Sequence, residues 1–200
     1  MATEPYLQSL IYKEATVAQN NSTDEVEIRK EYYESGALAR ETPYVNGVKH
    51  GMLKAYFESG ALWYETPYMN GRMHGTTKTY YESDILRWET PFVNGKTHGI
   101  EKTYYETGAL WCETPYRKGK RHGIEKTYYE SGALHYETPY VNGERHGIAK
   151  RYYVTGALWY ETPYVNGMRH GLERGYDEEK TNIYFLALYN KDQEVVSVKI

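Results

Sequence analysis

The chain has 200 residues and a formal net charge of −3, with 40% hydrophobic and 26% charged residues, which is typical of one soluble domain. The small negative charge argues against a general attraction to nucleic acid or acidic lipid, although charge can still be concentrated locally. The single cysteine, Cys112, excludes an internal disulfide framework and a thiolate metal cluster. Tyrosine occurs 24 times and phenylalanine three times. Because tyrosine rings can bury one face and keep the hydroxyl in water, we expect a thin core.

Residues 1–29 are predicted to form an N-terminal cap, with the polar stretch AQNNSTDE at 18–25 as its loop. The first residues lack the basic segment followed by an apolar segment that a secretion signal has. No stretch approaches the ~18 apolar residues that a membrane helix needs. We therefore expect a cytoplasmic protein.

The sequence then repeats itself with a constant spacing of 24 residues. The stretch ETPYVNGVKHG begins at Glu41, returns as ETPYMNGRMHG at Glu65, and recurs in similar form in every later unit. Repetition at this period is typical of solenoids and related arrays. The six predicted units are 30–53, 54–77, 78–101, 102–125, 126–149 and 150–173. A degenerate seventh unit and a C-terminal capping hairpin, with NKDQ as its turn, are predicted for 174–200.

Each unit holds two short runs rich in Tyr, Thr and Trp, bracketed by turn signals such as ESGA at 130–133 and NGERHG at 142–147. This pattern predicts strands joined by tight turns. Gly in SG and NG supplies the positive φ that two-residue hairpin turns need. Asp84 replaces this Gly in the third unit, and Asp tolerates the left-handed region better than most residues. The predicted fold is all-β: a single elongated, twisted, antiparallel meander of tandem hairpins, solenoid-like, with capping hairpins at both ends.

A two-residue SG turn would place Tyr129 opposite Leu134 and Lys126 opposite Glu137. A three-residue loop would shift this register by one residue and remove the Lys–Glu pair, and the sequence leaves both possibilities open. The corresponding pairs in the other units are Lys30 with Glu41, Lys54 with Glu65, Lys78 with Glu89, Lys102 with Glu113, and Lys150 with Glu161. Proline cannot donate to a ladder, so Pro139 and its equivalents mark a bulge or a position without a ladder bond.

The repeat YYESGALWYETPYVNG, followed two residues later by HG, resembles the MORN repeat, specifically the bacterial variant found in YwqK-type antitoxin proteins. All six units carry the pattern nearly intact. The resemblance implies a β-hairpin array without catalytic residues, and a bacterial binding protein whose partner is a secreted toxin. The sequence departs from the variant at Thr77, Glu101, Glu125 and Ala149, where the variant often has Trp. The Trp at 63, 111 or 159 is a candidate replacement for this missing aromatic.

Candidates for chemistry are weak, because they recur in every unit. The histidines at 50, 74, 98, 122, 146 and 170 lie in successive hairpins about 10 Å apart, whereas one zinc ion holds its ligands at ~2 Å. We expect them to support turns. An acid–base enzyme needs one asymmetric site, whereas Glu41 recurs in all six units. Cys112 would need a dedicated base to act as a nucleophile. No Ser-His-Asp triad, P-loop or dinucleotide-binding motif occurs. We expect neither an enzyme nor a metal or cofactor site.

Two sets of variable residues are candidate binding surfaces. The first is an aromatic stripe just before the Tyr64 position, where Trp and Arg are typical of binding hot spots; the same rings could instead simply cover the tyrosine layer. The aromatic stripe consists of Trp63, Arg87, Trp88, Trp111, His135 and Trp159.

The second candidate is a basic edge at the NG turns, opposite an acidic edge at the ESG turns. Charged turns are often only solvated, but separation by sign can steer a charged partner. The basic edge consists of Lys49, Arg72, Lys96, Arg117, Lys118, Lys120, Arg121, Arg145 and Arg169.

Three hypotheses follow. The first is a non-catalytic scaffold that neutralises a cognate toxin by direct binding, as an antitoxin or immunity protein. The second is an adaptor that binds anionic lipid through the basic edge, and the third is self-assembly through exposed end strands. Nucleic acid is not an expected partner, and the oligomeric state is left open.

Overall fold

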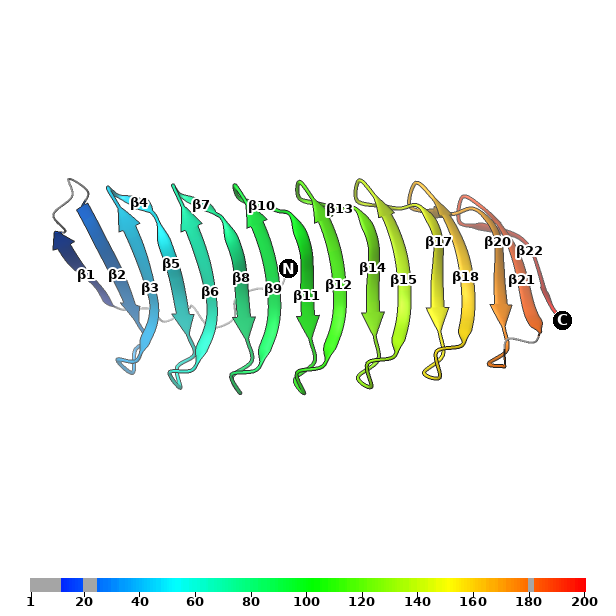
Figure 1. Ribbon diagram of the computed structural model, residues 1–200, viewed down its shortest axis with the longest axis horizontal. Helices are drawn as coiled ribbons and strands as arrows, with labels where there is room; N and C mark the ends of the chain where they lie inside the picture. The colour runs from blue at the N-terminus through cyan, green and yellow to red at the C-terminus, as the bar shows by residue number, and fades with distance from the viewer. Residues whose placement is uncertain (1–11, 20–24, 180–181) are drawn as a thin grey trace. The chain divides into compact units, whose positions relative to one another are not determined.

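The computed structural model describes residues 12–19, 25–179 and 182–200, and their regular elements are strands without a helix. The strand pairs are antiparallel, and consecutive long strands form hairpins (Figure 1), so the predicted all-β hairpin fold is confirmed. The contacts divide the chain into two compact units, 1–96 and 97–200. Each is described by itself below.

The first unit begins with β1 (Tyr12–Gln19), which pairs with β2 (Glu25–Tyr32). Long strands and two-residue strands then follow one another in chain order. They are β3 (Leu38–Val45), β4 (Val48–Lys49), β5 (Gly51–Tyr56), β6 (Leu62–Met69), β7 (Arg72–Met73), β8 (Gly75–Tyr80) and β9 (Leu86–Val93), with β10 (Lys96–Thr97) at the boundary.

The second unit repeats the same pattern and ends in a hairpin whose turn lies at Lys191 and Asp192, within NKDQ. Its strands are β11 (Gly99–Tyr104), β12 (Leu110–Arg117), β13 (Lys120–Arg121), β14 (Gly123–Tyr128), β15 (Leu134–Val141), β16 (Glu144–Arg145), β17 (Gly147–Tyr152), β18 (Leu158–Val165), β19 (Met168–Arg169), β20 (Gly171–Tyr176), β21 (Ile183–Asn190) and β22 (Gln193–Lys199).

The NG turns are two-residue turns, as predicted. Val141 pairs with Glu144, and the residues between them, Asn142 and Gly143, have φ of 54° and 98°. Two consecutive positive φ values are those of a type I′ turn, whose twist suits a hairpin. The Gly143 amide also donates to the Arg121 carbonyl at 2.9 Å, which ties this turn to the preceding repeat.

The SG turns take the second of the two alternatives that the sequence left open, the three-residue loop. The Tyr129 amide donates to the Ala133 carbonyl, and the Gly132 amide donates to the Tyr129 carbonyl, so the loop has three residues and not two. Gly132 takes the left-handed position that such loops need, with φ of 86°. Asp84 fills the same position with φ of 63°, so that turn survives the substitution.

The longer loop does not remove the Lys–Glu pair, because a β-bulge restores the register. Tyr128 pairs with Leu134, whereas Thr127 pairs with Tyr136, so His135 is an extra residue on its strand. The pairing of Tyr129 with Leu134 that a two-residue turn would give is therefore not formed. One added loop residue and one added strand residue cancel, so Lys126 lies opposite Glu137, although a three-residue loop by itself was expected to remove this pair. The register puts the other five predicted Lys–Glu pairs opposite each other too.

A second irregularity explains the recurring His-Gly. Tyr140 pairs with Arg145, but Glu137 pairs with Lys150, so β16 and β17 carry two more residues than β15 at this place. Gly147 has φ of 113°, and the His146 amide donates to the Pro139 carbonyl at 2.9 Å. Proline therefore lies opposite a bulge, one of the two alternatives that the sequence left open.

The core is thin, as the tyrosine content predicts. In the second unit the buried residues include Thr103, Thr114, Tyr140, Ala187 and Tyr189. Tyrosine hydroxyls link successive repeats: the Oη of Tyr129 donates to the Tyr152 carbonyl at 2.9 Å. Because such contacts join neighbouring repeats only, stability depends mainly on the interfaces between adjacent hairpins.

Candidate functional site

The β-bulge places its extra residue, which varies from repeat to repeat, beside the aromatic residue that follows it. In β15 these two residues are His135 and Tyr136. Side chains alternate between the two faces of a strand, and a bulge interrupts this alternation. The ring of His135 lies 4.2 Å from that of its neighbour Tyr136 and stacks on Tyr129 at 4.1 Å. We call this face of the second unit, with Tyr136, Thr138 and Tyr140, the tyrosine face.

The other members of the aromatic stripe make similar contacts. In the first unit, Trp63 lies 5.8 Å from Phe57 and 5.1 Å from Tyr64. Arg87 lies over the ring of Trp88 at 5.6 Å. These rings therefore partly cover the tyrosine layer, which is one of the two roles that the sequence allowed.

The tryptophans of the second unit differ in exposure. Trp111 is 48% exposed and lies 6.4 Å from Tyr105. Trp159 is half-buried and stacks on Tyr153 at 4.9 Å. A half-exposed tryptophan keeps apolar surface available for a partner, so Trp111 is the clearest contact candidate of the stripe in this unit.

Arg151 is a residue of this site that the sequence analysis missed. Its guanidinium lies 3.9 Å from the ring centre of Trp159 and 5.2 Å from that of Tyr136, within the range of cation–π attraction. Its Nε is buried without a hydrogen-bond partner in the described part of the chain. The repeat could have revealed it, because the equivalent residues are Thr103 and Thr127.

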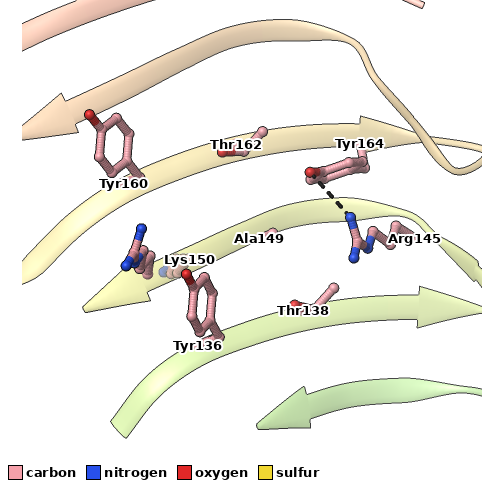
Figure 2. Close-up of a pocket in the computed structure, with 9 residues that line it drawn as sticks. Tyr136, Thr138, Arg145, Ala149, Lys150, Tyr160, Thr162 and Tyr164 are labelled. Atoms are coloured by element: carbon pink, nitrogen blue, oxygen red, sulfur yellow. Dashed lines mark hydrogen bonds between the residues drawn. The ribbon is translucent and has the colours of Figure 1, made fainter. Parts of the chain in front are cut away.

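Next to Arg151 the tyrosine face is hollowed. The hollow has a volume of about 120 Å³. Figure 2 shows Ala149 between Thr138 and Thr162. The Arg145 guanidinium donates a hydrogen bond to the hydroxyl of Tyr164. The lining residues are Tyr136, Thr138, Arg145, Ala149, Lys150, Arg151, Tyr160, Thr162 and Tyr164.

The basic edge divides into two groups in the second unit. Arg121, Arg145 and Arg169 lie over the rings of Tyr140, Tyr164 and Tyr189. Arg121 also lies 3.5 Å from a carboxylate oxygen of Glu125, and Arg169 lies 3.5 Å from Asp192. These two arginines are partly neutralised within the fold. Arg117, Lys118 and Lys120 are exposed and have no carboxylate partner among the described residues.

The basic edge of the first unit is smaller. Lys49 lies 5.2 Å from the ring centre of Tyr68. Arg72 and Lys96 are exposed, at the NG turns.

Burial, hydrogen bonds and neighbouring charges shift the pKa of a tyrosine, a histidine and the cysteine. Burial, with a hydrogen bond to Glu113, raises the pKa of Tyr128 to about 12. Burial lowers the pKa of His135, and the positive charge of Arg151 lowers it further. Burial also raises the pKa of the Cys112 thiol, which makes the thiolate scarcer at neutral pH and Cys112 a poor nucleophile.

The described residues contain no cluster of three or more His, Cys, Asp or Glu side chains that could hold a metal ion. The recurring histidines donate backbone hydrogen bonds to proline carbonyls, as His122 does to Pro115 at 2.9 Å. In the part of the chain that is described, no helix is both long enough and apolar enough to cross a bilayer.

Tandem β-hairpins with a bulge in each define a repeat scaffold that presents side chains from a thin sheet. The family model for the MORN repeat variant matches residues 28–46, 49–70, 97–118, 121–142 and 145–166, which together make up more than half of the chain. The chain belongs to this family of non-catalytic repeat scaffolds, whose repeats are generally binding motifs. No curated protein matches the chain.

Proposed function

We propose that this protein is an antitoxin or immunity protein that neutralises a cognate toxin by direct binding. The observation that supports the proposal best is the exposed ring of Trp111 on the bulge, 48% exposed beside Tyr105. Aromatic and arginine side chains on a rigid frame are the residues that most often dominate the energy of protein interfaces. The repeat scaffold supplies that frame without supplying catalytic groups.

The proposal is tested with the purified product of the neighbouring gene. Replacing Trp63, Trp111 and Trp159 with Ala is expected to weaken its binding at least tenfold and to abolish protection of cells that express it. The single variant Trp111→Glu tests the most exposed position with little risk to folding. Urea unfolding of each variant separates lost binding from lost stability.

A matched control is available on the opposite face of the second unit. Ile100, Ile124 and Ile148 are 50–51% exposed and lie opposite prolines. Replacing all three with Ala removes apolar surface of similar exposure and is expected to leave binding intact. Equal binding by the Trp variants and the wild type would remove the aromatic stripe from the proposal.

A second candidate function is binding to anionic lipid. The observation that favours it is the group of exposed cations without carboxylate partners, Arg117, Lys118 and Lys120, at one turn. Flotation with vesicles containing phosphatidylserine decides it. Salt-sensitive binding that is lost when the three residues become Ser would support lipid binding, and no binding at low salt would reject it.

A further inference from the structure

Ala149 is an exception in an otherwise acidic position of the second unit. The equivalent residues one repeat before and one repeat after it are Glu125 and Glu173. Like Ala149, both belong to strands that follow a His-Gly bulge, two residues beyond the Gly. The three positions therefore have the same backbone setting and differ in the side chain.

The two glutamates show what this position normally holds. The carboxylate of Glu125 accepts a hydrogen bond from the Thr114 hydroxyl at 3.0 Å and lies 3.5 Å from the Arg121 guanidinium. The carboxylate of Glu173 accepts a hydrogen bond from the Thr162 hydroxyl at 2.6 Å. The fold thus provides a binding position for a carboxylate, formed by a threonine hydroxyl and, at Glu125, also by an arginine guanidinium.

At Ala149 the equivalent threonine and arginine are present, but the side chain has no carboxylate. Thr138 and Arg145 are the counterparts of Thr114 and Arg121, and both line the 120 Å³ hollow above Ala149 (Figure 2). Neither of them contacts a carboxylate within the described chain. Arg151 adds a second guanidinium to the same hollow, where the flanking repeats have Thr127 and Gly175.

We propose that this hollow is a binding site for a carboxylate group. A carboxylate there would accept a hydrogen bond from the Thr138 hydroxyl, as Glu125 does from Thr114, and it would face the guanidinium groups of Arg145 and Arg151, where Glu125 faces that of Arg121. Charge-assisted bonds from arginine to a carboxylate are among the stronger hydrogen bonds in proteins. The volume suits the end of an acidic side chain or a small carboxylic acid. The proposal is independent of the antitoxin function, because it concerns the ligand group and not the partner.

Binding is measured on the full chain by NMR, with sodium acetate as the free carboxylate and a blocked tripeptide with a central Glu as the peptide source. Sodium chloride at equal ionic strength is the control, and inorganic phosphate is the competing anion. We expect saturable shifts of the Thr138, Arg145 and Arg151 signals with acetate or the tripeptide. The tighter ligand identifies the source. Shifts with phosphate alone, or with chloride to the same extent, would overturn the proposal.

Three designed variants test the site without relying on a loss of folding. Ala149→Glu supplies the missing carboxylate from the chain itself, so it is expected to weaken acetate binding at least tenfold and to raise the melting temperature. Ala149→Gln has nearly the same size without the charge, and its melting temperature is expected to rise less. Conversely, the double variant E125A/T127R copies the hollow one repeat earlier, and a second set of acetate-dependent shifts at Thr114 and Arg121 is expected. Unchanged acetate binding by Ala149→Glu would overturn the proposal.

Discussion

Gly147 lies against Pro139 so closely that a Cβ atom on Gly147 would be 3.1 Å from the proline Cγ. Gly147 also has φ of 113°, a conformation that residues with a side chain rarely adopt. Steric space and backbone conformation therefore both require glycine here, and the same pair recurs at Gly123 with Pro115 and Gly171 with Pro163.

Replacing Gly147 with Ala is expected to destabilise the fold by roughly 2–3 kcal/mol, because the strain of the positive φ adds to the contact with proline. Gly132→Ala is the matched control, since its φ is also positive but nothing lies within 4 Å of an added Cβ; a cost of about 1 kcal/mol is expected from strain alone. Urea unfolding measures both. Equal costs would show that the proline contact does not matter.

The contribution of the tyrosine hydroxyls to stability can be tested by removing one hydroxyl and by adding another. Tyr129→Phe removes the hydrogen bond to the Tyr152 carbonyl and is expected to cost about 1 kcal/mol. Phe57 occupies the same position of its own repeat without a hydroxyl. Phe57→Tyr is therefore expected to gain about 0.5–1 kcal/mol by donating to the Tyr80 carbonyl. If neither change alters the denaturation midpoint, the hydroxyls do not stabilise the repeat interface.

His135 is expected to make stability depend on pH. Because the pKa of His135 is lowered in the folded protein, the unfolded chain takes up a proton first as the pH falls. The stability that the neutral ring contributes above the ordinary histidine pKa of 6.5 is therefore lost below that pH. The free energy of unfolding, measured from pH 8 to pH 5, should fall less steeply in His135→Trp, which introduces the residue of the neighbouring repeats. Arg151→Thr should also reduce the slope, because it removes a positive charge that adds to the effect of burial. A slope unchanged in both variants would contradict this account.

The bulge predicts an unusual tolerance to deletion. Removing Trp111 eliminates the extra residue, so Lys102 should still pair with Glu113, and the expected cost is about 1 kcal/mol for the lost ring contact with Tyr105. Removing Thr114, beyond the bulge, would move each following side chain of that strand to the other face and should cost several times more. Cross-strand NOEs between Lys102 and Glu113 report the register. Their loss on deletion of Trp111 would contradict the assignment of the bulge.

The hairpins and the NG turns could be predicted because each depends on local residues with a fixed spacing. The Lys–Glu register stayed open, because it depends on the loop length and on the bulge together. The bulge at His135 could not, because an extra loop residue and an extra strand residue have opposite effects on the register and cancel before Lys126. The hollow at Ala149 was also missed. The substitutions at 149 and 151 are visible in the repeat, but it takes the structure, with the hydrogen bonds from Thr114 to Glu125 and from Thr162 to Glu173, to show that the position normally holds a bound carboxylate.

The bulge residue also has an evolutionary consequence. Its side chain changes from Ala39 to Trp63 to Arg87 while the pairing on either side of it is the same. A mutation there alters the chemistry of the surface in one repeat without disturbing the ladder, so new specificities can accumulate one codon at a time. Duplication of a 24-residue unit would extend the array and add one more such position.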